Sequence, residues 1–194
     1  MKKGGTVKEG IGLTEVKTLR AQVRKRLDDG AMTSGYKAKA DTVVKLLNEA
    51  LATEIVCVLR YKRHFFMAAG ISSFSAKAEF LQHAMEEQAH ADPLAERIVQ
   101  LGGEPNLSSE GFLNPSHQEY AEGESLREMI TEDLIAKRIV IDSYREMVAS
   151  VATEDPTTCK VLERILAQEE AHAADRARLL KILGPESQSH RSGP

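Results

Sequence analysis

The sequence contains no tryptophan, and aromatic residues of all kinds make up only 5% of it. Alanine, leucine, glutamate and arginine recur throughout instead, and all four are good helix formers. This balance favours helices over a sheet. A hydrophobic fraction of 42% in 194 residues is enough to build the core of one domain of ordinary size.

Long apolar runs are also missing. None approaches the roughly 20 residues that a membrane-spanning helix requires, so we expect no membrane partner. The basic start, Met1 to Gly5, is not followed by an apolar stretch, so we expect no secretory signal and a cytoplasmic protein. Cysteine is scarce, since Cys57 and Cys159 are the only two. In a cytoplasmic chain two such thiols are expected to stay reduced.

Acidic residues are few at the start of the chain. Residues 1–40 contain ten Lys and Arg against four Asp and Glu, a net charge of +6. The whole chain has a net charge of -3, so the remainder carries -3 - 6 = -9. The basic segment could bind nucleic acid, contact the acidic face of a neighbouring subunit, or remain a solvated tail, and these alternatives stay open.

Apolar residues recur at three- and four-residue steps in five segments, which predicts amphipathic helices. The first segment, about 14–29, belongs to the basic extension. The four longer segments cover about 41–70, 75–101, 125–152 and 156–183. Asp41 and Asp155 are expected helix N-caps, and Pro156 suits the first turn of the last helix. Pro93 should kink the second long helix, or else split it into two helices.

The links between the long helices differ in length. The link over 104–122 is long and rich in Gly, Asn and Pro, whereas the other two are short. This layout predicts an all-α four-helix bundle with one long crossover between its second and third helices. We therefore expect a basic extension with a short amphipathic helix over 1–40, the bundle over 41–184, and a polar, disordered tail over 185–194.

Part of the chain repeats itself. A shift of 82 residues aligns Glu87 with Glu169 and His90 with His172, and a shift of 83 aligns the first long helix with the third. Two such helical hairpins should form a bundle with pseudo-twofold symmetry, in which matching positions face each other across the core. Each Glu-x-x-His pair shares one helical face, so acid and imidazole groups from both copies should converge.

Converging acid and imidazole groups predict a metal site, because buried carboxylates are costly unless they are paired or bind a cation. Oxygen and imidazole ligands suit iron or manganese, and zinc less distinctively. Bundles with two metals take one Glu from each of two helices and Glu-x-x-His from the other two. Glu54 fits the first of the single positions. Its equivalent in the repeat is Lys137.

Several segments together resemble bacterioferritins. Residues 47–54, followed by Tyr61 and His64, resemble the family's first helix, 87–92 the second, 169–172 the fourth, and 102–107 the start of the crossover. The resemblance covers about 41–183. It implies a ferritin-like protein that forms a homo-oligomeric shell, acts as a ferroxidase and stores iron. It also implies metal ligands and a hydrogen-bond donor to a ligand carboxylate, Tyr61. The implied ligands, whose carboxylates also act in catalysis, are Glu54, Glu87, His90, Glu169 and His172.

Three departures from the family pattern matter. Gln88 stands where bacterioferritins carry their haem methionine, and Met85 lies on another face, so we expect no haem. The family's short fifth helix has no counterpart after Gly184, which makes the chain similar to the smaller cages of the Dps type. Lys137 stands where both the family and the internal repeat require a glutamate.

Lys137 leaves three alternatives open. Its ammonium could replace the second metal and bridge Glu54 and Glu169, which leaves one metal. Lys137 could instead point outward while an acid such as Asp133 ligates, which keeps two metals. The third alternative is a site held by salt bridges alone, without metal.

Further residues near the site have two interpretations each. Tyr61 and Tyr144 are either hydrogen-bond donors or packed core residues. Cys57 could contact the site, but it is expected to be a small buried hydrophobic residue. His64 and His83 are expected at the surface or in packing, with a peripheral ligand role as the alternative for His83, which lies one turn from Glu87.

The leading functional interpretation is oxidation of ferrous iron and iron storage, with one or two irons per chain. The alternatives are a Dps-like protein that protects DNA through residues 1–40, a di-metal oxidase or peroxidase, and a homologue whose catalysis is impaired by Lys137.

Overall fold

The computed structural model describes residues 14–25, 27, 30–69, 73–110 and 121–184. The chain divides into two compact units, Met1–Tyr36 and Lys37–Pro194. In the first unit, helix α1 spans Val16–Val23 and buries none of its residues. It is shorter than the predicted 14–29. The disorder predicted for 185–194 concerns residues outside the described part of the chain.

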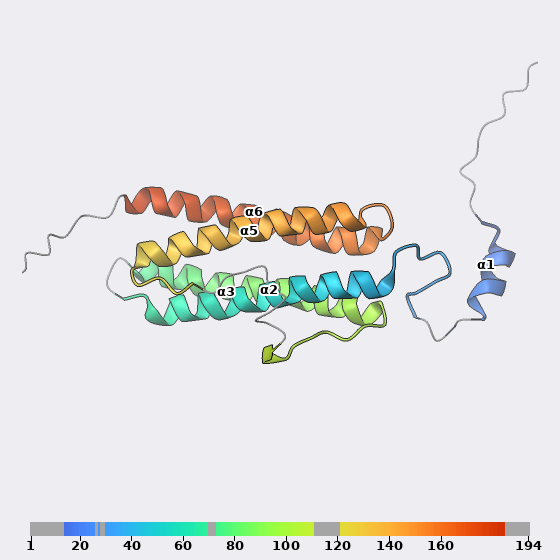
Figure 1. Cartoon of the computed structure of the whole chain (residues 1–194). Helices are drawn as coiled ribbons and strands as arrows, with labels where there is room; N and C mark the ends of the chain where they lie inside the picture. Colours follow the sequence, from blue (N-terminus) through green and yellow to red (C-terminus); the bar gives the residue numbers. More distant parts are fainter. Residues whose placement is uncertain (1–13, 26, 28–29, 70–72, 111–120, 185–194) are drawn as a thin grey trace, which may run out of the picture. The chain divides into compact units, whose positions relative to one another are not determined.

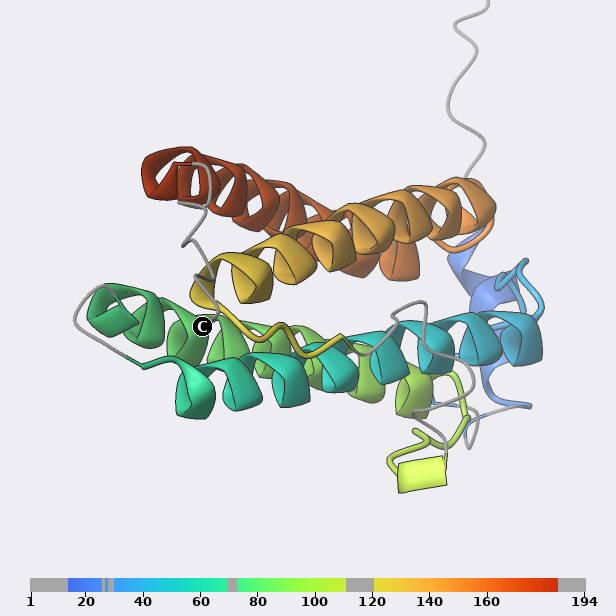
Figure 2. The same ribbon diagram turned by 60° about the vertical axis from the view of Figure 1, so that its left-hand side comes forward.

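The second unit is the predicted four-helix bundle. Figures 1 and 2 show two helical hairpins, α2 with α3 and α5 with α6, lying side by side. The long link, residues 101–125, joins the two hairpins, as the sequence predicts. Among the described residues, no helix combines the length and apolarity needed to cross a membrane. The bundle helices are α2 (Ala40–Met67), α3 (Ser73–Gln100), α5 (Leu126–Val151) and α6 (Pro156–Leu183).

The ends of α6 are as predicted, whereas the start of α2 is not. Asp155 caps α6 and accepts a hydrogen bond from the Thr158 amide, with Pro156 directly after the cap. The prediction that Asp41 caps α2 is wrong, because Lys39 occupies that position and makes no side-chain cap bond. Asp41 lies in the first turn, where its negative charge still favours the positive end of the helix dipole.

Helix α3 continues through Pro93, so the alternative of two separate helices is wrong. A proline removes one backbone donor, and buried Ala91 and Leu94 on either side hold the helix against the core. Beyond α3, the crossover begins at a close contact, because a Cβ atom added to Gly103 would lie 2.6 Å from Val44 Cγ1. Any larger residue at position 103 would therefore force the Val44 side chain to shift.

The residues predicted as metal ligands lie midway along the helices, between two apolar layers. One layer surrounds Phe80 and Ile130 near the end of the bundle where α2 passes into α3. The other contains Leu47, Leu94 and Leu162, none of which is exposed. Charged side chains between two such layers are cut off from water, so they must compensate one another or bind a cation.

Candidate metal centre

Three carboxylates and one imidazole meet in the middle of the bundle. Glu54 comes from α2, Glu87 and His90 from α3, and Glu169 from α6. Each has a potential ligand atom within 4.8 Å of those of the other three, and all four residues are buried. We name these four residues the central cluster. Its donor atoms, carboxylate oxygens and one imidazole nitrogen, suit a divalent cation such as ferrous iron.

Lys137 reaches into the central cluster from α5 and is only 1% exposed. Its Nζ atom lies 2.6 Å from Glu87 Oε1 and 2.5 Å from Glu169 Oε2. The hypothesis that it bridges Glu54 and Glu169 is therefore wrong in one partner, since the bridge joins Glu87 and Glu169. These are the carboxylates of the two Glu-x-x-His motifs.

The alternative in which Lys137 points outward and Asp133 takes its place is wrong as well. Asp133 is buried one helical turn away and its Oδ1 atom lies 3.1 Å from His64 Nδ1. His64 is itself buried, and its Nε2 atom contacts the Glu122 carbonyl oxygen at 3.0 Å. His64 thus packs inside the bundle and engages Asp133 away from the central cluster.

The two tyrosines of the internal repeat have different roles. The Tyr144 hydroxyl donates a hydrogen bond of 2.6 Å to Glu54 Oε1. By the internal repeat, the Tyr61 hydroxyl should donate a hydrogen bond to residue 137 in the same way. Lys137 is a donor and cannot accept that bond, and the buried Tyr61 hydroxyl has no hydrogen-bond partner among the described residues. The donor role that the resemblance implies for Tyr61 therefore falls to Tyr144, while the Lys137 ammonium lies 5.6 Å from the centre of the Tyr61 ring.

His90 is held from both sides. Its Nδ1 atom lies 3.1 Å from Glu169 Oε1 and 3.3 Å from Glu54 Oε2. Its Nε2 atom contacts Gln168 Oε1 at 3.2 Å, which fixes the orientation of the ring. Burial lowers the pKa of His90, but hydrogen bonds with Glu169, Glu54 and Glu87 outweigh it and raise the pKa to about 12.

Lys137 also keeps its positive charge. Burial opposes the charge, but Glu169 and Glu87 together raise the pKa of the ammonium well above its ordinary value. Without a metal, the positive charges of Lys137 and His90 therefore offset two of the three negative charges of the carboxylates. A cation that binds through His90 Nδ1 must replace a proton there.

His172, the second predicted imidazole ligand, lies apart from the central cluster. Its Nδ1 atom is 3.7 Å from Glu87 Oε1 and 3.9 Å from Glu169 Oε1, too far for hydrogen bonds. Its Nε2 atom faces the other way and lies 3.1 Å from Glu86 Oε2. Burial and the nearby Lys137 ammonium lower the pKa of His172, so the ring tends to be neutral.

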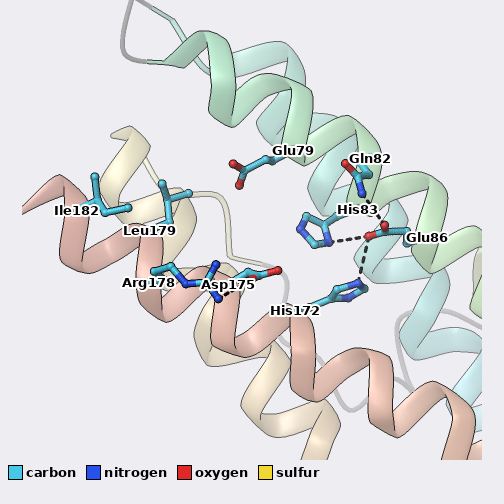
Figure 3. A pocket seen from close by; sticks show the side chains of 9 residues that line it. All are labelled: Glu79, Gln82, His83, Glu86, His172, Asp175, Arg178, Leu179 and Ile182. Atoms are coloured by element: carbon cyan, nitrogen blue, oxygen red, sulfur yellow. Dashed lines mark hydrogen bonds and ion pairs between the residues drawn. The ribbon is translucent and has the colours of Figure 1, made fainter.

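A pocket of about 360 Å³ lies beside His172, between α3 and α6. Figure 3 shows His83 and Glu86 of α3 facing His172 of α6 across it. Glu86 was not predicted as a ligand from the sequence, although its spacing of three residues from His83 on one helix was a usable signal. His83 is buried, as expected of a packing residue, and this burial is the largest cause that lowers its pKa to about 2.

Three other residues near the centre are not among the potential ligands. Gln88 is exposed on α3 and its side chain donates to Asp92 Oδ1, and Met85 is exposed on the same helix. Cys57 is buried, and burial raises the pKa of its thiol well above the ordinary value, so it is an unreactive core residue.

The donor atoms fit one divalent cation in the bundle centre better than two. The first position has Glu54 and His90 beside the shared carboxylates of Glu87 and Glu169. The second position would need a carboxylate where Lys137 places an ammonium group. A cation there would lie against a positive charge in a region closed to water, which is strongly unfavourable.

Comparison with known proteins agrees with this fold. The model of the ferritin-like domain of the Ferritin family matches residues 44–183. The bacterioferritin of Mycobacterium bovis is 30% identical to the chain over 131 residues, which are 67% of this chain and 78% of that protein.

Solved structures agree as well. A protein from Bacteroides fragilis, described as a dodecameric thioferritin and bacterioferritin-related, has a TM-score of 0.72 and 27% identity, covering 76% of this chain and 89% of that one. A ferritin-like, diiron-carboxylate protein from Bacillus anthracis has a TM-score of 0.65 and 26% identity, covering 77% and 99%. A Dps protein of Mycobacterium smegmatis, with 19% identity and a TM-score of 0.69, covers 73% and 96% and shares the fold.

Proposed function

Because the chain belongs to the ferritin family, we propose that it binds ferrous iron at the central cluster, one ion per chain, and serves in iron storage. The observation that carries this proposal is the convergence of Glu54, Glu87, His90 and Glu169 within 4.8 Å, with the Lys137 ammonium beside them. The description of the Bacillus anthracis relative as a diiron-carboxylate protein supports iron as the metal.

Each residue of the central cluster has a distinct task in this proposal. Glu54, held by the Tyr144 hydroxyl, and His90, held by Gln168, supply ligands whose orientation is fixed before the ion arrives. Glu87 and Glu169 supply carboxylate oxygens between that position and Lys137. Preorganised oxygen and imidazole donors in a buried site favour tight binding of a single divalent cation.

Lys137 takes the role of the second cation. Four glutamates would carry a charge of -4 and suit two divalent ions, whereas three glutamates and one lysine carry -2 and suit one. Reduction of dioxygen to hydrogen peroxide consumes two electrons, and one ferrous ion supplies one. We therefore expect slow iron oxidation by the wild-type chain, because a second electron donor must come from outside the cluster.

The decisive experiment compares wild type with Lys137→Glu in an anaerobic titration with ferrous iron, followed by anomalous diffraction at the iron edge. We expect one tightly bound ion among the central cluster of each wild-type chain and two in Lys137→Glu. The Lys137→Gln variant, which is neutral but adds no carboxylate, is the matched control and should bind one. Two ions among the central cluster of the wild type, or none, would refute the proposal.

The same variants separate binding from oxidation. We expect the initial rate at which ferric product forms in air to rise about tenfold or more in Lys137→Glu, since two ferrous ions would then lie in one centre. Lys137→Gln should oxidise iron no faster than wild type. An equal rise in both variants would show that the ammonium charge itself, rather than the lack of a second ion, limits the rate in the wild type.

We also propose that the protein assembles as a homo-oligomeric shell in the cytoplasm. The dodecameric state of the Bacteroides fragilis relative supports assembly. Exposed apolar side chains on the bundle support it too, among them Phe66, Phe74 and Met85, whose exposed fractions are 73%, 82% and 67%. Light scattering on the purified protein should give the mass of an assembly, and a monomer would contradict the shell.

Binding of DNA by the basic extension is the second candidate function. The charge of +6 on residues 1–40 supports it. Retention of DNA by the full chain, lost at high salt and lost on deletion of residues 1–40, would favour this role. If the full chain and the chain without residues 1–40 retain DNA equally, the basic extension has no such role.

A further inference from the structure

A second group of potential ligands lies outside the central cluster, at the inner end of the pocket between α3 and α6. His83 Nδ1 lies 3.0 Å and His172 Nε2 lies 3.1 Å from the same oxygen, Glu86 Oε2. Figure 3 shows this carboxylate between the two imidazole rings, with Gln82 on its other side. Gln82 donates a hydrogen bond of 2.8 Å to Glu86 Oε1, which leaves Oε2 directed at the histidines.

From this arrangement we propose that His83, Glu86 and His172 form a second divalent-cation site, which we name the pocket site. Both histidines are only 7% exposed. Neither His83 Nδ1 nor Glu86 Oε2 has a well-formed hydrogen bond within the described part of the chain. Buried polar atoms without good partners are rare in folded proteins, and a cation bound between these groups would satisfy them.

The distances between the ligand atoms suit a small cation. Two ligands about 2.1 Å from a tetrahedral ion lie roughly 3.4 Å apart. The observed separations from Glu86 Oε2, 3.0 and 3.1 Å, differ from that value by amounts that small side-chain rotations can supply. Two imidazoles with carboxylate oxygen suit ferrous iron or zinc.

The pocket site accounts for the different use of the two Glu-x-x-His motifs. His90 directs Nδ1 at the central cluster, whereas His172 directs Nε2 at Glu86. Lys137 occupies the position between Glu87 and Glu169, so a second cation is displaced outward to the side of His172 that faces the pocket. A cation that enters through the pocket meets this site before it reaches the central cluster.

The pocket also carries the appropriate charge. Among the described residues that line it, Glu79, Glu86 and Asp175 face a single cationic residue, Arg178. Asp175 forms a surface ion pair of 2.9 Å with Arg178, and Glu79 pairs at 3.1 Å with Arg176. Among the carboxylates that line the pocket, Glu86 is therefore the one whose ion-pair partners in the described part of the chain are the two histidines alone, with no Arg or Lys, and it remains available to a cation.

The test uses the full chain and Zn²⁺, which has no redox chemistry, as the probe. Crystals soaked in zinc should give an anomalous peak at the zinc edge among His83, Glu86 and His172. Calorimetric titration should show a binding class that His83→Ala weakens at least about tenfold, since loss even of a group that supports a ligand costs 10–100-fold. His83→Gln keeps the bulk of the side chain and should weaken the same class. Asp175→Asn removes a charge from the same pocket but no ligand, and should keep the peak.

The inference deepens the proposed function, on which it rests for the identity of the metal, and a second variant distinguishes the two. Glu54→Gln should remove the zinc peak of the central cluster and leave the peak of the pocket site. A central peak without a pocket peak in the wild type would overturn the pocket site alone. A pocket peak that survives His83→Ala unchanged would overturn it as well. A pocket peak without a central peak would instead refute the proposed function.

Discussion

Replacement of Lys137 by methionine tests the idea that its ammonium group stands in for a metal ion. Methionine is similarly long and unbranched, so it fills the space with little strain and removes the charge. Glu87 and Glu169, 2.6 and 2.5 Å from the ammonium, would then lose their shared partner in a region closed to water.

The expected magnitude follows from burial. Breaking a buried ion pair by removing one partner costs about 3–5 kcal/mol, because the remaining charges stay desolvated. Both carboxylates and the lysine are at most 1% exposed, so this range applies rather than the much smaller value for surface pairs. For a chain of this size it corresponds to a melting temperature roughly 6–20 °C lower.

The assay is thermal and urea unfolding of wild type and Lys137→Met, first with a chelator and then with Zn²⁺. The single cation that the central cluster binds should restore stability to Lys137→Met, by about 2.7 kcal/mol at a free concentration 100 times its dissociation constant. Wild type should gain less at the same zinc concentration, because the Lys137 ammonium repels the ion and weakens its binding. Lys62→Met, an exposed substitution on α2, is the control and should change little.

Two results would refute the reasoning. If Lys137→Met in chelator is as stable as wild type within about 0.5 kcal/mol, the ammonium does not compensate buried charge. If zinc stabilises both proteins equally, the ammonium and the bound cation do not compete for the same carboxylates.

Other predictions follow from neighbouring contacts. Tyr144→Phe should weaken zinc binding at the central cluster about tenfold in calorimetry, whereas Tyr61→Phe should not, because the Tyr144 hydroxyl holds Glu54; equal losses would contradict this asymmetry. Asp155→Ala removes the cap of α6 and a buried ion pair, and should lower the free energy of unfolding in urea by about 3–5 kcal/mol; a loss below about 1 kcal/mol would contradict it. The folded state lowers the pKa of His83 from 6.5 to about 2, so the unfolded chain binds more protons and stability is lost as the pH falls below 6.5. Melting curves in chelator between about pH 7 and pH 5 should show a smaller loss for His83→Gln than for wild type.

Features that depend on neighbours along the chain were predictable from the sequence. The periodicity of apolar residues identified the four long helices, because each helix needs only one apolar face to pack. The cap at Asp155 with Pro156 follows from local backbone geometry. The two Glu-x-x-His motifs were recognisable because residues three apart share a helical face, whatever packs against it.

The main failures concern atoms on different helices. The repeat predicted equivalent roles for Tyr61 and Tyr144, but one change of charge at residue 137 removes the acceptor for Tyr61 and leaves Tyr144 as the donor. The repeat likewise predicted that His172 would match His90, whereas His172 turns toward Glu86. Local spacing contains no information about such differences, because both motifs are the same along the chain.

The sequence by itself therefore determined the four long helices, their order, and that both Glu-x-x-His motifs face the core. The tertiary structure decided which carboxylates Lys137 joins and on which side of His172 a cation can bind. The physical reason is that contacts between helices depend on their rotation and shift relative to one another. Differences of about an ångström in that packing decide whether two buried groups form a hydrogen bond or stand apart.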